Sequence, residues 1–157
     1  MNDTKRLELI AEAVRYCQRV AAMGMPSSCY TKALREPIHF LWERRVGSKF
    51  RVARYRSKNA VGLKAGSRQI VFDHAVPFNY CQKELLKLED ITPDSVRAVL
   101  EKFNTIVLIT QAEDARLKHA GLNHAMPPES DGTDVLARYK AVGIVLVDNA
   151  QPSAKLA

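Results

Sequence analysis

Two short apolar runs limit what this chain can fold into. The first, Ile70 to Val76, reads Ile-Val-Phe-Asp-His-Ala-Val and is closed by Pro77. The second, Thr105 to Ile109, is uninterrupted after its first residue, which indicates a buried strand. We expect the two runs to pair as antiparallel strands of a small sheet, with the helix that follows the second run packed on them.

Most of the remaining chain has the periodicity of helices. Pro37 interrupts one of the periodic segments, so a single kinked helix and two shorter helices are both open. Thr110 and Glu113 form a capping-box pattern at the start of another segment. From the three-to-four spacing of apolar residues, helices are predicted over residues 4–22, 28–45, 81–88, 92–103, 110–121 and 133–142.

Weaker strand patterns lie outside the two runs. Residues 50–55 alternate imperfectly between apolar and polar side chains, and the turn-rich segment 65–67 precedes the first run. We therefore predict a hairpin that joins 50–55 to 68–76 across this turn. Residues 144–147 are predicted to form a final strand or an apolar tail.

These patterns together predict the α+β class, as a mainly helical single domain with a small antiparallel sheet and a strand–strand–helix core. A length of 157 residues, of which 46% are hydrophobic, suits one domain with its own core. The domain is expected to span residues 1–150. Its parts are a helical region (1–48), a basic hairpin with the core (49–121), and a last helix and strand (122–147), before a flexible tail (148–157).

Positive charge is concentrated in one segment. The net charge is +7, but residues 32–68 hold eleven Lys or Arg and only two acids, which makes that segment +9 and the rest of the chain −2. A basic block on a near-neutral body is typical of proteins that bind a polyanion, although a solvated basic face without a partner is the alternative. We predict that DNA, or RNA, contacts Arg44, Arg45, Lys49, Arg51, Arg54, Arg56, Lys58, Lys64 and Arg68.

Several classes of protein find no support. The three cysteines, Cys17, Cys29 and Cys81, form no Cys-x-x-Cys pair, which argues against a disulfide framework and a zinc finger. No apolar run approaches the ~20 residues that cross a bilayer, and no secretory signal is present, so we expect a cytoplasmic protein without a membrane partner. Phosphate-binding Gly-rich loops and the Gly-x-Ser-x-Gly motif of serine hydrolases are also missing.

The segment from about residue 70 to 121 resembles the HNH, or ββα-metal, endonuclease family. In that family an acid or histidine followed by a histidine ends a first strand, and an asparagine lies in or after the connecting loop. A second strand then leads into a helix that supplies the remaining metal ligands. Here Asp73-His74 ends the first run, Asn104 precedes the second run, and Asp114 lies in the helix after it.

The resemblance implies a metal-dependent endonuclease. Asp73 and Asp114 would hold a divalent ion (Mg, Mn or Zn), His74 would be the general base, and Asn104 would orient the loop. Two carboxylates leave positions on such an ion for water and phosphate oxygens. A histidine with an ordinary pKa of about 6.5 can take a proton from water at neutral pH.

Further residues and simpler interpretations stay open. His119 and His124 could reach a metal or a phosphate from the loop after the helix. As structural residues, Asp73 would cap a turn, Asp114 would suit the helix dipole and Asn104 would end a helix. His74 would then be a core histidine that is hydrogen-bonded to the backbone.

Two other functions remain open as well. A non-catalytic nucleic-acid-binding module would need the basic segment but not the Asp-His site. A subunit of a larger defence or mobile-element complex would dock through the apolar run 144–147. The sequence leaves the oligomeric state, the native metal and the preferred substrate open.

Overall fold

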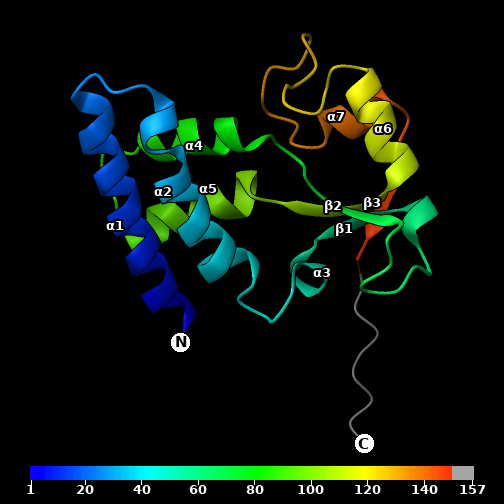
Figure 1. The fold of residues 1–157 in the computed structure, drawn as a ribbon, viewed down its shortest axis with the longest axis horizontal. Coiled ribbons are helices and arrows are strands. Elements are labelled where there is room, and N and C mark those ends of the chain that lie inside the picture. Colours follow the sequence, from blue (N-terminus) through cyan, green and yellow to red (C-terminus); the bar gives the residue numbers. More distant parts are fainter. Residues whose placement is uncertain (150–157) are drawn as a thin grey trace, which may run out of the picture.

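The computed structural model describes residues 1–149 and divides them into a helical half and a sheet half (Figure 1). The helical half contains α1 (Asp3–Ala22), α2 (Thr31–Pro37), α4 (Phe78–Leu86) and α5 (Pro93–Phe103). The sheet half contains β1 (Tyr55–Ser57), β2 (Ile70–His74), β3 (Ile106–Thr110) and β4 (Leu146–Asp148). Beside the sheet lie α3 (Lys49–Val52), α6 (Gln111–His119) and α7 (Ala137–Ala141). The predicted α+β class is confirmed.

Helix α1 organises the helical half. Leu7, Ile10 and Val14 recur on one face and are fully buried against α2 and α5. The side chain of Asn2 caps the helix by accepting a hydrogen bond from a backbone N–H of the first turn. The helix predicted over 4–22 is confirmed and begins one residue earlier.

The predicted break at Pro37 is present. Helix α2 ends there, and the chain continues as a π-helix, η2 (Ile38–Glu43), because proline supplies no N–H for the α-helical ladder. Neighbouring residues of a helix point in different directions around its axis. Trp42 therefore packs into the helical core while the adjacent Glu43, also buried, faces the sheet half.

The four strands are ordered β2-β3-β1-β4. Strands β2 and β3 are antiparallel, with Asp73 opposite Val107 and His74 opposite Ile106. The predicted pairing of the two apolar runs is confirmed, and α6 packs on both strands. Strand β1 runs parallel to β3 and antiparallel to β4, so the sheet is mixed and not wholly antiparallel as predicted.

The predicted hairpin between 50–55 and 68–76 is wrong. Residues 49–52 form α3, β1 begins only at Tyr55, and β3 lies between β1 and β2. The reason is the apolar character of β3. A strand that is buried along nearly its whole length needs a neighbour on each side, so it takes the centre of the sheet.

The two faces of the sheet are covered differently. Val107 and Ile109 pack with residues of α6 and α7, whereas Ile106 and Leu108 pack with residues of and around α3. Successive side chains of a strand point to opposite faces. Asp73, opposite Val107, thus faces α7, and the neighbouring His74 faces the helical half.

The start of α6 is the predicted capping box. The Thr110 side chain accepts from the N–H of Glu113, and the Glu113 carboxylate accepts from the N–H of Thr110 at 2.8 Å. The same carboxylate accepts from Ser57 Oγ at 2.6 Å, which ties α6 to β1. Glu113 is therefore a structural residue.

The C-terminal elements are shorter than predicted. Helix α7 covers only 137–141 of the expected 133–142, and β4 begins at Leu146. Asn149 is buried, and its side chain donates to the carbonyl of Ala53 at 2.8 Å, so the part of the predicted tail that is described is fixed to the sheet half. The rest of that tail, 150–157, lies outside the described residues.

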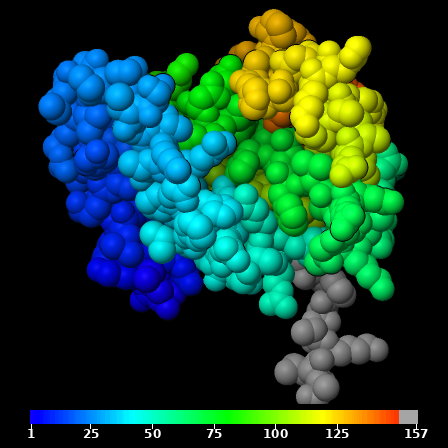
Figure 2. Space-filling view, viewed as in Figure 1, coloured from blue at the N-terminus to red at the C-terminus, as the bar shows by residue number. Residues whose placement is uncertain are grey.

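Figure 2 shows the light-blue and cyan residues of α2, η2 and α3 lying across the boundary between the two halves.

None of the helices within residues 1–149 has the length and apolar character needed to cross a membrane.

Candidate active site

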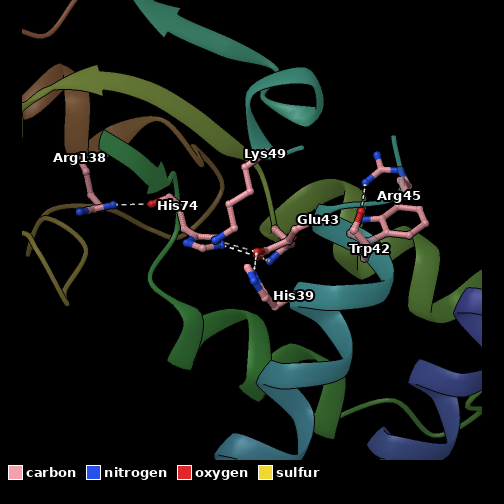
Figure 3. A network of polar contacts seen from close by, with 8 residues as sticks. His39, Trp42, Glu43, Arg45, Lys49, His74 and Arg138 are labelled. Carbon is pink, nitrogen blue, oxygen red and sulfur yellow. Dashed lines mark hydrogen bonds and ion pairs between the residues drawn. The ribbon is translucent and has the colours of Figure 1, made fainter. Parts of the chain in front are cut away.

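Four polar side chains contact the buried carboxylate of Glu43 at the boundary between the halves (Figure 3). Its side chain is 5% exposed. His74 Nε2 lies 2.5 Å from Oε1, and Asn104 Nδ2 donates to the same oxygen at 3.1 Å. His39 Nδ1 and Lys49 Nζ each lie 3.1 Å from Oε2.

The five residues come from four separate parts of the fold. His39 and Glu43 are one turn apart on η2, and Lys49 is the first residue of α3. His74 ends β2, and Asn104 is the C-cap of α5, just before β3. The ends of elements from both halves thus converge on one carboxylate.

The charge of Glu43 is strongly stabilised. Burial alone would raise the pKa of this carboxyl, but the hydrogen bond and charge of His74, the charge of Lys49 and the hydrogen bond of His39 together outweigh it. They hold the pKa of Glu43 well below its ordinary value of 4.5. Glu43 is therefore an anion at every pH at which the protein is expected to work.

The contact with Glu43 fixes the orientation of the His74 ring. A neutral His74 that donates through Nε2 to the carboxylate keeps its lone pair on Nδ1. No residue of the described range 1–149 forms a hydrogen bond with that nitrogen, and the side chain is 25% exposed. The backbone carbonyl of His74 accepts from Arg138 Nη1 at 2.6 Å, which fixes the end of β2 from the other side (Figure 3).

His74 forms part of the walls of two pockets. The Glu43 pocket has a volume of about 260 Å³ and is lined by Arg35, Glu36, His39, Glu43, Lys49, His74 and Phe78. The Asp73 pocket, of about 320 Å³, is lined by Arg35, Asp73, His74, Pro77, Phe78, Asn79, Asn123, His124 and Arg138. Since Arg35, His74 and Phe78 line both, the pockets adjoin along these three residues.

The predicted metal ligand Asp73 lies beside His74 but has its own partners. Its Oδ2 accepts from Tyr139 Oη at 2.7 Å and from Arg138 Nη1 at 3.1 Å. The Arg138 side chain is 1% exposed, so Asp73 is the counter-ion of a buried cation. Burial, together with the charge and hydrogen bond of Asp73, raises the pKa of Tyr139.

The other predicted ligand, Asp114, lies elsewhere. It forms an ion pair with Lys118 at 2.7 Å on the outer side of α6. That helix starts after Thr110, which is opposite Ile70, whereas Asp73 lies three residues further along β2. Asp114 and His119 line neither of the two pockets, whereas His124 lines the Asp73 pocket.

A metal site remains a prediction. No group of three or more His, Cys, Asp or Glu side chains within residues 1–149 is placed to hold a metal ion. As they stand, Asp73 and Asp114 do not fit a shared ion, because each carboxylate already faces a cation.

The basic residues predicted to contact nucleic acid fall into two groups. Three have partners within the protein: Lys49 binds Glu43, Arg45 stacks on the Trp42 ring, and the Arg56 guanidinium donates to the side chain of Asn149 at 2.7 Å. The other six are exposed, namely Arg44, Arg51, Arg54, Lys58, Lys64 and Arg68, and of these the Arg54 guanidinium also lies over the Tyr55 ring.

Sequence reasoning missed Glu43, His39 and Arg35 as members of the site. One signal was available for Glu43, because it is one of only two acids among the eleven cations of residues 32–68. An acid in such a block, four residues after a histidine on a helical segment, is a natural counter-ion.

Comparisons with models of protein families, with curated proteins and with solved structures found no match to this chain.

We predict that Glu43→Gln changes how stability depends on pH. The folded-state pKa of Glu43 is depressed, so its contribution is complete above the ordinary pKa of 4.5 and is lost as the pH falls toward the folded-state value. The variant should lose about 3 kcal/mol at neutral pH, because four cationic or polar donors lose their anion. Below about pH 4.5 its stability should fall less steeply, by up to about 1.4 kcal/mol per pH unit.

Urea unfolding of both proteins at several values between about pH 3 and pH 7 measures this difference. The half-buried Glu84, which pairs with Lys87 of the next turn, supplies the matched control Glu84→Gln. Parallel pH profiles for wild type and Glu43→Gln would contradict the assignment.

We also predict that the two aspartates differ in their structural roles. Asp73→Asn should lower the free energy of unfolding by about 3 kcal/mol, because it leaves buried Arg138 without a counter-ion. Asp114→Asn should change it by less than about 0.5 kcal/mol, since its ion pair is on the surface. Chemical denaturation of the two variants checks this, and equal effects would show that Asp73 does not balance the Arg138 charge.

Proposed function

We propose that this protein is a nuclease that hydrolyses phosphodiester bonds, DNA ahead of RNA, with His74 as the general base. The observation that carries the proposal is the 2.5 Å contact between His74 Nε2 and the buried Glu43 carboxylate, beside a pocket that Arg35 and Lys49 also line. A histidine held by a buried carboxylate is the arrangement that enzymes use to activate water or a hydroxyl group.

The chemistry follows from the ring orientation. His74 Nδ1 takes a proton from a water molecule as that water attacks the phosphorus atom, and the P–O bond to the leaving sugar oxygen breaks, with that oxygen taking a proton from solvent. Glu43 holds the ring in the tautomer that leaves Nδ1 unprotonated, and its charge stabilises the imidazolium that forms. Because the low pKa of Glu43 keeps it ionised, the proton stays on His74 and does not move to Glu43, and His74 releases it to solvent after the P–O bond has broken.

Arginine and lysine side chains around His74 suit a phosphate. Arg35 lines both adjoining pockets, so its guanidinium can reach a group on either side of the imidazole. Positive groups beside the phosphate stabilise the charge that develops on its oxygens in the transition state. The exposed basic residues of α3 and of the segment after β1 would hold the flanking strand without reading its sequence.

The proposed steps do not use the divalent ion that the HNH-like pattern implies. Whether cleavage requires such an ion is tested separately. An ion at a scissile phosphate would stabilise the leaving oxygen. No step above is assigned to it, because the carboxylates of Asp73 and Asp114 are each engaged with a cation.

A cleavage assay tests the proposal. Plasmid DNA and single-stranded RNA are incubated with the purified protein and magnesium, manganese or zinc, and again with a chelator. His74→Ala should lower the rate by at least about a hundredfold, the usual contribution of a general base. Glu43→Gln should lower it by about tenfold to a hundredfold, because the base then loses the group that orients it.

Tyr16→Ala, on the exposed face of α1, is the control and should cleave at the wild-type rate. Equal rates for wild type and His74→Ala, or no cleavage by wild type with any of the three metals, would reject the nuclease. Loss of cleavage in the chelator would support a metal requirement, and full activity there would reject it.

The second candidate is a non-catalytic nucleic-acid-binding module, favoured by the six exposed basic residues named above. It predicts DNA binding whose affinity falls with salt and is unchanged by a chelator or by His74→Ala. Arg51→Ala and Lys58→Ala should each reduce the slope of log affinity against log salt by about one. Fluorescence anisotropy of a labelled duplex measures these slopes. Salt-dependent binding without cleavage would favour this candidate over the nuclease.

A further inference from the structure

A third pocket has Asn104, whose side chain donates to Glu43, among its lining residues. It has a volume of about 340 Å³. We call it the Trp42 pocket, and it is lined by Trp42, Arg45, Val52, Arg54, Leu100, Glu101, Asn104, Thr105 and Ile106. Its polar groups are of two kinds, guanidinium donors and oxygen acceptors, and apolar side chains form the rest of its walls.

One wall is a planar cation held in place. The Arg45 guanidinium carbon lies 3.9 Å from the centre of the Trp42 ring, and Arg45 Nη1 donates to the Trp42 carbonyl at 2.7 Å (Figure 3). Trp42 is itself buried in the helical core. The guanidinium is therefore stacked on a fixed support, and such a plane is a surface on which nucleobases stack.

Asn104, one of the residues that line this pocket, also carries an unpaired acceptor. Asn104 Nδ2 donates to Glu43, and because a carboxylate only accepts, this contact fixes which end of the amide is the oxygen. No donor among residues 1–149 reaches Asn104 Oδ1, and the residue is only 7% exposed. Buried acceptors without a donor are rare in folded proteins, and because this oxygen is itself enclosed, an N–H group of a ligand pairs with it only after the atoms that cover it shift.

Two exposed side chains complete the set. Glu101, which lies 3.9 Å from Arg97, adds a second acceptor, and Arg54, which lies over the Tyr55 ring, adds a second guanidinium. The ligand that fits is flat, carries N–H donors on one edge and acceptors on another, and bears negative charge nearby. A nucleotide has these properties. Guanine is the nucleobase that offers two adjacent donors, N1–H and N2–H, together with the acceptors O6 and N7.

We propose that the Trp42 pocket binds the base of a guanine nucleotide, either free or as an unpaired residue of a nucleic acid. The base stacks on Arg45 and donates N1–H and N2–H to the two oxygens of the Glu101 carboxylate, with Asn104 Oδ1 as a further acceptor once the atoms that cover it shift, and Arg54 faces O6 and N7 or the phosphate. The inference extends the proposed nuclease by giving it a base preference next to the cleavage site. Asn104 and His74 contact the same oxygen of Glu43, so the two sites are adjacent.

The chain reports on this pocket without a label, because Trp42 is its only tryptophan. Wild-type protein is titrated with the 5′-monophosphates of guanosine, adenosine, cytidine and uridine while Trp42 emission is followed, and equilibrium dialysis measures the same affinities independently. Guanosine monophosphate should bind saturably and at least about tenfold tighter than the pyrimidine nucleotides.

Two variants test the assigned contacts. Arg45→Lys keeps the charge but removes the stacking plane, and should weaken guanosine monophosphate about tenfold. Glu101→Gln changes an exposed side chain, so it should fold normally, and should weaken guanosine monophosphate about tenfold while leaving adenosine monophosphate unchanged. Arg19→Lys, an exposed substitution on α1, is the matched control and should bind as wild type.

The source of the nucleotide is tested with His74→Ala protein, which should bind without turnover. Tighter binding of a single-stranded oligonucleotide with one guanine than of its inosine-for-guanine counterpart would place the ligand within nucleic acid, whereas equal affinity for the oligonucleotide and the monophosphate would favour a free nucleotide.

Absence of saturable binding by both methods at millimolar concentration, or equal affinity for all four bases, would overturn the pocket assignment. Binding is measured without cleavage, so the pocket can stand if the nuclease fails, and cleavage can stand if the pocket fails.

Discussion

The burial of one carboxylate is the constraint on which the arrangement of this protein depends. A charge such as that of Glu43 is costly to remove from water unless several donors surround it. Those donors cannot come from its own helical turn alone. His39 is local, but Lys49, His74 and Asn104 must be brought from α3, β2 and the end of α5. The polar cluster and the packing of the helical half on the sheet half therefore depend on each other.

Local patterns account for the parts of the fold that the sequence predicts well. Apolar periodicity and caps locate α1, α5 and α6, and the uninterrupted run of β3 identifies a buried strand. The order of strands is a different kind of information. It depends on which strand must be shielded on both sides, and the short β1 and β4 carry too few residues to indicate their partners. The hairpin prediction failed for that reason.

The residues of the candidate site can be divided in the same way, into those with a local sequence signal and those whose role depends on distant partners. His74 and Asn104 can be selected from the sequence because each stands at the end of a predicted element, and the fold brings both to one oxygen atom. Their shared partner Glu43 is 31 residues before His74 and 61 before Asn104, and the partner of Asp73, Arg138, is 65 residues away. A carboxylate beside a histidine suggests a metal ligand from its type alone. Only its surroundings reveal that it neutralises a buried arginine.

Because of the path of the backbone, the Glu43 cluster links the helical half to the sheet half. Within residues 1–149 the chain passes between the helical and sheet halves three times: from η2 to α3, from β2 to α4, and from α5 to β3. Each passage carries a member of the cluster, Glu43 with Lys49, His74, and Asn104. One half cannot swing away from the other without pulling on all three passages. The halves should thus share one cooperative unfolding unit, and slow hydrogen exchange should extend across their boundary.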